Sequence, residues 1–216
     1  MLKYILFDLD GTLTDPKEGI TKCVQYALKK FGIERECDEL LEFIGPPLKE
    51  HFMGYANLSD EDGTLAVKYY RERYAPIGIF ENGIYDGVIT MLSALKEKGY
   101  TLAIATSKPR IFSEKICDKY GISKYITYLS GSELDGTNTD KAAVIKNAME
   151  FLGAQKDETI MIGDRIYDLE GADTNEIQSI AVSYGYGTME ELKKGNAVAI
   201  VDSPLKIIDA IKKYTL

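Results

Sequence analysis

Short apolar runs alternate with helical patterns along most of this chain. Several of the runs carry branched apolar residues, as at Ile160, Ile162 and Ile180, which suits strands that are buried on both faces of a parallel sheet. Strands that alternate with helices form βαβ units, so the pattern predicts an α/β fold with a doubly wound parallel sheet. The six strands are expected at residues 3–7, 101–105, 125–129, 159–162, 179–183 and 198–201.

The helices between these strands have recognisable ends. Between Val88 and Leu95, apolar residues follow the spacing i, i+3, i+4, i+7 of an amphipathic helix. Thr188 and Glu191 form a possible capping box at the start of a later helix. Three of the helical patterns are followed by a glycine that marks a C-terminal end, namely Gly99, Gly121 and Gly153.

Residues 15–82 interrupt the alternation. This stretch shows helical spacing, with Ser59 and Asp62 placed to cap one of its helices, and it contains a Gly-Pro-Pro turn at 45–47. We therefore expect a helical domain at 15–82, inserted into a core made of residues 1–14 and 83–216.

Composition narrows the class of protein. The chain has 216 residues, 45% hydrophobic and 28% charged, which is an ordinary globular balance. Its net charge of −8 argues against nonspecific binding of nucleic acids, so an anionic substrate would need local cations or a metal ion. The three cysteines show no CxxC spacing and are expected to be reduced. With no signal peptide and no apolar run of bilayer length in the sequence, a cytoplasmic protein is expected.

Two aspartates at the end of the first strand are the most informative feature. The apolar run 5–7 leads into Asp8 and Asp10, followed by Gly11 and Thr12. In an extended chain, residues i and i+2 lie on one face, and two carboxylates beside a buried strand are costly unless a cation offsets them. The alternative is that the two aspartates only cap a turn.

Three further stretches are placed to meet these aspartates. Thr106-Ser107 and Asp164 follow expected strands, and Lys141 opens an expected helix. Ligands of doubly wound sheets bind beyond the carboxyl ends of the strands, so all of these side chains would converge on one edge with Asp8. Taken singly, Lys141 could be a solvated helix residue, Thr106 a loop cap and Asp164 a turn residue.

The order and spacing of these stretches resemble the haloacid dehalogenase superfamily of phosphatases, in particular its phosphoglycolate phosphatase-like and 5′-nucleotidase-like members with a helical cap. That family carries an Asp-x-Asp-x-Thr motif, a Ser or Thr after a strand, a lysine, and Gly-Asp with a later Asp. The matching residues are Asp8-Leu9-Asp10-Gly11-Thr12, Thr106, Lys141, and Gly163-Asp164 with Asp168.

The resemblance implies roles for the acidic residues. Asp8 would be the nucleophile that forms an aspartyl-phosphate, and Asp10 would be the general acid and base, positioned by Thr12. Mg²⁺ would be held by Asp8, the backbone carbonyl of Asp10, and Asp164. Oxygen ligands suit this hard ion, whereas a single histidine and no thiolate cluster argue against zinc.

The resemblance also implies how the phosphoryl group is bound. Lys141, the Thr106 hydroxyl and the Ser107 amide would bind the phosphoryl oxygens and stabilise charge in the transition state. Lys108 would contact the substrate or only solvent. Asp168 would lie behind the site and orient Lys141 or a metal-bound water.

The inserted domain at 15–82 resembles the mobile cap of this family, which excludes water and supplies specificity. Lys49 and His51 follow the Gly-Pro-Pro turn and are candidates to bind an anionic substrate; alternatively, they are exposed polar residues at a helix junction. Family members often have Pro-Gly where the cap returns to the core, whereas this chain has Tyr85-Asp86-Gly87.

The predicted function is therefore Mg²⁺-dependent hydrolysis of a small-molecule phosphate monoester, with phosphoglycolate as the first substrate. The alternatives are a 5′-nucleotidase acting on nucleoside monophosphates and a phosphosugar mutase. Two alternatives from other classes of protein are a phospho-accepting signalling module and a catalytically silent metabolite-binding protein. The presence of Asp10 disfavours a dehalogenase. The expected partner is a small phosphorylated metabolite, with no nucleic-acid polymer or membrane, for a monomer or homodimer.

Overall fold

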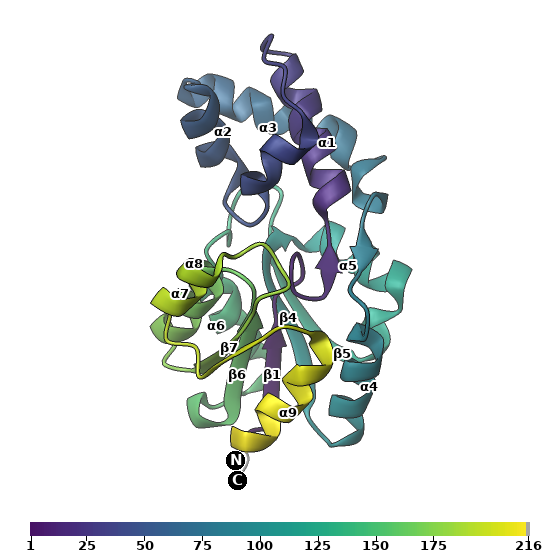
Figure 1. The fold of residues 1–216 in the computed structure, drawn as a ribbon, viewed down its shortest axis with the longest axis vertical. Helices are drawn as coiled ribbons and strands as arrows, with labels where there is room; N and C mark the ends of the chain where they lie inside the picture. Colours follow the sequence, from purple (N-terminus) through teal and green to yellow (C-terminus); the bar gives the residue numbers. More distant parts are fainter. Residues whose placement is uncertain (215–216) are drawn as a thin grey trace. The chain divides into compact units, whose positions relative to one another are not determined.

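The computed structural model describes residues 1–214, and the chain forms two compact units (Figure 1). Met1–Asp15 and the chain from Ile84 onward form the core unit, and Pro16–Gly83 form the inserted unit. Each boundary lies one residue later than the one expected from the sequence. Within residues 1–214, none of the helices combines the length and apolar character that crossing a membrane requires.

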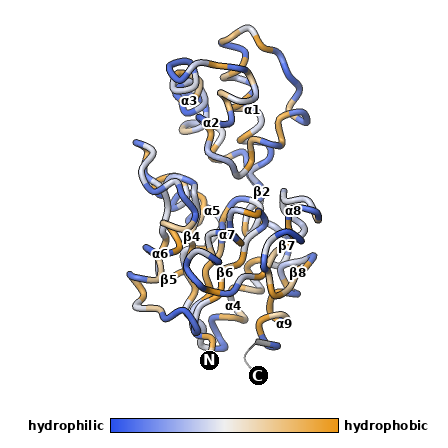
Figure 2. The backbone as a smooth tube through the Cα atoms, turned by 90° about the vertical axis from the view of Figure 1, so that its left-hand side faces the viewer, coloured by the Kyte–Doolittle hydropathy of each residue, from blue (hydrophilic) through white to orange (hydrophobic). Residues whose placement is uncertain are grey.

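The core unit is built on a six-stranded parallel sheet in the order β5-β4-β1-β6-β7-β8. This confirms the predicted α/β fold with a doubly wound parallel sheet. Hydrophobic residues run along the central strands, and hydrophilic ones colour many of the outer loops (Figure 2). The strands are β1 (Tyr4–Phe7), β4 (Thr101–Pro109), β5 (Ile126–Ser132), β6 (Thr159–Gly163), β7 (Gln178–Val182) and β8 (Ala199–Val201).

Helices flank this sheet, and the glycine-marked ends lie where the sequence predicts them. The chain turns into the left-handed conformation at Gly121, with φ +70°, and at Gly153, with φ +62°, directly after α5 and α6. At Thr188, the side chain accepts a hydrogen bond from the Glu191 amide at 3.1 Å and caps α8. The core-unit helices are α4 (Val88–Glu97), α5 (Arg110–Tyr120), α6 (Lys141–Leu152), α7 (Ile166–Thr174), α8 (Met189–Lys194) and α9 (Pro204–Tyr214).

One hydrophobic cluster fixes helix α6 against the sheet. Leu6, Ala105 and Met161 from three adjacent strands pack with Val144 and Ile145 from the first turns of α6, and all five are fully buried. Full burial of an aliphatic side chain contributes about 1.5–3 kcal/mol. The N-terminal end of α6, where the functional lysine is expected, is therefore held firmly against the sheet.

The inserted unit is helical, as expected. Its Ser59 side chain accepts a hydrogen bond from the Asp62 amide at 3.1 Å, which confirms the predicted cap of α3. Helix α3 packs against α1 and α2, with Tyr70 and Tyr74 stacked 5.2 Å apart. Its main elements are α1 (Lys17–Lys29), the 3-10 helix η1 (Cys37–Phe43), α2 (Leu48–Ala56) and α3 (Asp60–Tyr74).

The sequence does not predict a second, small sheet: β2 (Thr14–Asp15) pairs with β3 (Gly83–Ile84), where the chain leaves the core unit and returns to it. Two-residue strands carry no detectable period-2 pattern, because such a pattern needs about four residues or more. Only the pairing in space reveals them.

Candidate active site

The candidate site lies where the direction of winding of the sheet changes. From β1 the chain proceeds to β4 and β5 on one side, and then to β6, β7 and β8 on the other. Asp8 follows β1 directly, Asp164 follows β6 directly, and these two strands are neighbours. Ligands of open α/β sheets bind at such a switch point, beyond the carboxyl ends of the strands. The two aspartates are therefore where the topology would place a functional site.

Lys141 is the first residue of α6, and its ammonium group lies between two carboxylates. The Nζ atom is 2.6 Å from Oδ1 of Asp8 and 2.8 Å from Oδ1 of Asp168, and it donates to the carbonyl of Ala105 at 3.3 Å. The exposed fractions of the Lys141, Asp8 and Asp168 side chains are 8%, 9% and 1%. Buried charges are tolerated only when they are paired, so these three side chains form one electrostatic unit.

Asp164 completes the acidic cluster. Asp8, Asp164 and Asp168 each offer a carboxylate oxygen, and these oxygens lie within 4.8 Å of one another. Asp164 accepts hydrogen bonds from the Tyr186 amide at 2.7 Å and from the Thr12 hydroxyl at 3.4 Å. Each carboxylate is thus held in place by polar partners and burial.

The acidic cluster holds more carboxylates than cations, and the pKa values of its members are shifted accordingly. Burial, followed by the charges of Asp168 and Asp8, raises the pKa of Asp164 well above its usual value. Burial raises the pKa of Asp168 to about 6, against the opposing charge of Lys141. Burial lowers the pKa of Lys141, but the neighbouring Asp168 and Asp8 outweigh it and raise this pKa overall. Three carboxylates face one ammonium group, and a divalent cation would neutralise the excess negative charge.

The donor set fits magnesium. Asp8 and Asp164, the two candidate side-chain ligands in this cluster, are carboxylates, and hard cations such as Mg²⁺ prefer oxygen. The backbone at Gly11, where φ is +90°, lies very close to the Asp164 carboxylate. A Cβ at this position would lie 2.2 Å from Oδ2 of Asp164. At Gly185, a Cβ would lie 2.4 Å from Cβ of Asp164. Only glycine allows the backbone this close to the carboxylate.

Asp10 lies apart from the three clustered carboxylates. Its carboxylate forms an ion pair with Lys108 and accepts a hydrogen bond from the Thr14 hydroxyl at 3.4 Å. Burial raises the pKa of Asp10, whereas the Lys108 charge lowers it. Thr12 was expected to position Asp10, but its hydroxyl contacts Asp164 instead, and Thr14 makes the contact with Asp10. The structure thus adds Thr14 to the residues around Asp10 and shows that Lys108 pairs with Asp10.

Thr106 and Ser107 occupy the end of a longer strand than expected. Strand β4 continues to Pro109, which pairs with Ser132 of β5 after a shift in register. This irregular pairing extended the strand past residue 105 and could not be read from hydrophobicity. Thr106 is buried, its hydroxyl accepts a hydrogen bond from the Lys108 amide at 3.3 Å, and Ser132 donates to the Ser107 carbonyl at 2.8 Å. Their binding of phosphoryl oxygens stays a prediction.

The two cap candidates lie in the inserted unit, each close to an acidic side chain of that unit. The Nζ atom of Lys49 is 2.7 Å from Asp60, and Nε2 of His51 is 3.2 Å from a carboxylate oxygen of Glu42. The His51 ring also lies edge-on to Phe43, with ring centroids 4.4 Å apart. Contact of Lys49 or His51 with substrate stays a prediction.

Sequence reasoning missed the tyrosines that support the site. The Tyr186 amide binds Asp164, and the Tyr184 hydroxyl donates to the carbonyl of Thr12 at 2.8 Å. A signal was available, because Tyr-Gly-Tyr-Gly at 184–187 follows an expected strand. Closely spaced glycines there mark a close approach of the backbone to another group.

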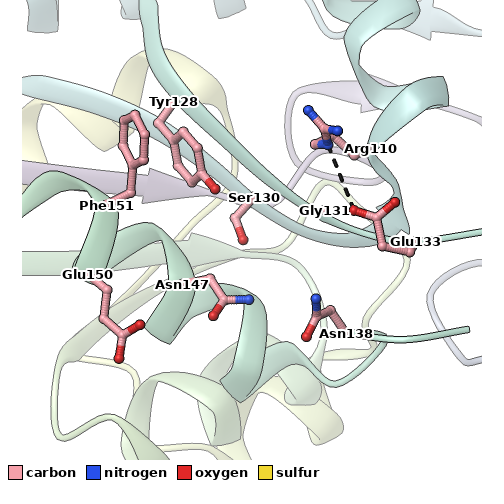
Figure 3. Close-up of a pocket in the computed structure, with 9 residues that line it drawn as sticks. All are labelled: Arg110, Tyr128, Ser130, Gly131, Glu133, Asn138, Asn147, Glu150 and Phe151. Carbon is pink, nitrogen blue, oxygen red and sulfur yellow. Dashed lines mark ion pairs between the residues drawn. The ribbon is translucent and has the colours of Figure 1, made fainter.

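A separate hollow of about 400 Å³ lies on the β5 side of the core unit (Figure 3). Tyr128 and Phe151 stack at one end of it, with ring centroids 3.8 Å apart, and the Arg110–Glu133 ion pair lies at the other. None of the residues that line it belongs to the predicted site. The acidic cluster is a closely packed centre, distinct from this open hollow.

The core unit thus combines a doubly wound parallel α/β fold with aspartates directly after the neighbouring strands β1 and β6. Residues 5–182 match the model of the haloacid dehalogenase-like hydrolase family, and the chain belongs to this family. This confirms the resemblance seen in the motifs.

The relatives of the chain carry names of more than one activity. A 5′-nucleotidase of Pseudomonas aeruginosa is 44% identical over 195 residues, which cover 89% of this chain and 88% of the relative. Tyrosine-protein kinase PtkA of Mycobacterium tuberculosis is 32% identical, over 92% of this chain and 68% of that protein. The crystal structure of a predicted phosphatase from Clostridium acetobutylicum superimposes with a TM-score of 0.95, at 47% identity and 99% coverage of both chains. Together, the family, its phosphatase relatives and the structural neighbours indicate a hydrolase of the phosphatase class.

Proposed function

We propose that this protein hydrolyses phosphate monoesters of small molecules through Asp8, with Mg²⁺ held by Asp8, Asp164 and the backbone carbonyl of Asp10. The observation that supports this most strongly is the buried contact of Asp8 with Lys141 at 2.6 Å, beside Asp164. A carboxylate fixed next to both a cation and a metal-binding cluster is suited to attack a phosphorus atom whose oxygens need positive partners.

The chain's own residues supply the chemistry in two steps. An Asp8 oxygen attacks phosphorus and forms the acyl-phosphate bond, while the ester oxygen leaves and takes a proton from Asp10. Water then attacks this phosphorus and gives a proton back to Asp10, which releases phosphate and regenerates the Asp8 carboxylate. Burial raises the pKa of Asp10 against the opposing charge of Lys108, which is the direction that a general acid requires.

Lys141 would stay protonated and contact the phosphoryl oxygens during transfer, because its pKa is raised by Asp168 and Asp8 against the effect of burial. The Thr106 hydroxyl and the Ser107 amide would bind the same oxygens. When bound, Mg²⁺ supplies the positive charge that the three carboxylates lack and that the phosphoryl group needs.

Nucleoside 5′-monophosphates are the substrate class that the relatives favour. The Pseudomonas aeruginosa 5′-nucleotidase is 44% identical to this chain, whereas a phosphoglycolate phosphatase of Vibrio parahaemolyticus is 25% identical. We therefore place nucleoside monophosphates first and phosphoglycolate second. The inserted unit would act as the cap over the substrate, and the cytoplasmic location and the monomer or homodimer stay predictions.

The test is phosphate release from nucleoside 5′-monophosphates, phosphoglycolate and an aryl phosphate, each with Mg²⁺ and with a chelator. We expect release that the chelator abolishes, and a fall of about 10³-fold or more in Asp8→Asn. Asp209→Asn is the matched control, because Asp209 is an exposed aspartate paired with Lys212 on α9. Full turnover in Asp8→Asn, or release that is indifferent to the chelator, would refute the proposal.

A further inference from the structure

The Tyr-Gly-Tyr-Gly loop, residues 184–187 between β7 and α8, touches both Asp164 and the segment that leaves the core unit. In Figure 1 it belongs to the yellow-green part of the chain that runs between these two elements. No step of the proposed reaction uses its side chains. Its contacts nevertheless reach a candidate metal ligand.

Tyr186 forms hydrogen bonds with three residues outside the loop, one of them between its phenol and that of Tyr85. Its amide donates to Oδ2 of Asp164 at 2.7 Å, and its phenol oxygen forms a short hydrogen bond with the carboxylate of Asp15. Asp15 is the last residue of the core unit before the chain enters the inserted unit. One residue therefore links the acidic cluster to the point of exit.

The backbone of the loop packs closely against Asp164. A Cβ at Gly185 would lie 2.4 Å from Cβ of Asp164, and a Cβ at Gly187 would lie 2.0 Å from the Asp164 carbonyl oxygen. Two glycines also make the loop intrinsically flexible, because glycine loses the most conformational freedom on ordering. A loop of this kind needs a side-chain anchor to hold its amide in one direction.

Tyr184 adds a weaker set of contacts nearby. Its hydroxyl donates to the Thr12 carbonyl at 2.8 Å, and its ring lies 5.0 Å from that of Tyr85. The Tyr85 amide in turn donates to the Leu13 carbonyl at 3.3 Å. These contacts hold the surroundings of the loop but do not reach the Asp164 carboxylate directly.

We propose that Tyr186 is a positioning residue for the cation site: its phenol, anchored on Asp15, fixes the loop so that its amide keeps the Asp164 carboxylate directed toward Asp8. The inference rests on the proposed function, because it takes Asp164 as a metal ligand. Hydrogen-bond partners behind a metal ligand set its orientation, and their loss typically weakens metal binding by about 10–100-fold.

The experiment measures Mg²⁺ binding by titration calorimetry on the phosphate-free protein, so the readout does not depend on turnover. Tyr186→Phe removes the phenol oxygen and keeps the ring and the amide. We expect its dissociation constant for Mg²⁺ to rise about 10-fold. Its activity should recover toward that of the unaltered protein at saturating Mg²⁺, since only metal binding is weakened. Tyr26→Phe is the matched control, because it loses a phenol–carboxylate hydrogen bond to Glu72 in the inserted unit, and it should leave the constant unchanged.

A second variant tests the same bond from its other end. Asp15→Ala should weaken Mg²⁺ binding as much as Tyr186→Phe, and the double variant should be no weaker than either single one. Asp15→Ala also carries the test if Tyr186→Phe does not fold. A Tyr186→Phe constant within twofold of the unaltered protein, or additive effects of the two changes, would overturn the inference and leave the proposed function standing. Absence of Mg²⁺ binding by the unaltered protein would overturn both.

Discussion

Replacing Lys141 by methionine removes the ammonium group between Asp8 and Asp168 and keeps a side chain of similar length. In the structure that group is 2.6 Å from Asp8 and 2.8 Å from Asp168. The variant leaves two buried carboxylates facing each other without their cation. Asp168 is only 1% exposed, so bulk solvent does not reach the carboxylate that loses its partner.

The expected cost is large for a single substitution. Removing one partner of a buried ion pair destabilises a protein by about 3–5 kcal/mol, because an uncompensated charge remains. For a chain of 216 residues, each 1 kcal/mol lowers the melting temperature by about 2–4 °C, so we expect a fall of about 6–20 °C.

The cost should depend on pH in a definite direction. The pKa of Asp168 is raised by burial to about 6 even though the charge of Lys141 lowers it, so removing Lys141 raises this pKa further. The same carboxyl has a pKa near 3.9 in the unfolded chain. A carboxyl whose pKa is raised on folding loses stability as the pH rises from the unfolded value through the folded one. The penalty of Lys141→Met should therefore be greatest above about pH 7 and smaller at pH 5, where Asp168 holds a proton.

The assay is urea or thermal unfolding, followed by circular dichroism at pH 5 and pH 8 with a chelator present. Lys146→Met is the matched control, because Lys146 lies on the same helix, is 67% exposed and is 3.8 Å from Glu150. An exposed pair of this kind contributes about 0.3–0.5 kcal/mol. A loss below about 1 kcal/mol in Lys141→Met at pH 8, or equal losses at both pH values, would show that the buried carboxylates do not depend on this lysine.

Two other substitutions test the electrostatics around the site. Lys108→Met removes the charge that lowers the pKa of Asp10. The limb of the pH–rate profile that reports Asp10 should therefore move to higher pH. An unmoved limb would contradict the assignment of Asp10 as the acid. Glu191→Gln weakens the bonds from the Arg165 side chain at 2.8 Å and the Ile166 amide at 2.9 Å, and should cost about 1.5–3 kcal/mol at pH 7 by urea unfolding. Burial raises the pKa of Glu191, but these bonds outweigh it and lower this pKa overall. The stability that Glu191 contributes should therefore be present at neutral pH and be lost as the pH falls below about 4. A difference in unfolding free energy between Glu191→Gln and the unaltered protein that stays constant across that range would contradict this.

The six-stranded sheet could be predicted because the sequence of each strand carries its own pattern. All six parallel strands have short, β-branched, apolar runs, and glycines mark the ends of α5 and α6. The strands β2 and β3 were not predictable, because each has two residues and exists only through its partner. The extension of β4 to Pro109 likewise depends on pairing with Ser132 and not on local pattern.

Some features of the candidate site could likewise be predicted from the sequence, and others could not. The positions of Asp8, Lys141 and Asp164 follow from strand and helix ends, so motif spacing and topology were sufficient. The direction of each side chain was not available from spacing: Thr12 contacts Asp164, and Lys108 contacts Asp10. These pairings depend on the tight turn after β1, where Leu13 and Thr14 donate their amides back to the carbonyl of Leu9.

The central place of β1 also affects how the chain can fold during synthesis. Tyr4 pairs with Thr101 on one side and with Thr159 on the other, and the whole inserted unit lies before either partner. At about 5–20 residues per second, a ribosome needs roughly 5–20 s to make the stretch between β1 and its first neighbour. Throughout that interval an apolar strand has emerged with no edge to join, and the inserted unit, which is contiguous in sequence, can fold first. Asp8, the proposed nucleophile, is thus made before both neighbours of its strand and reaches its final surroundings only after they have formed.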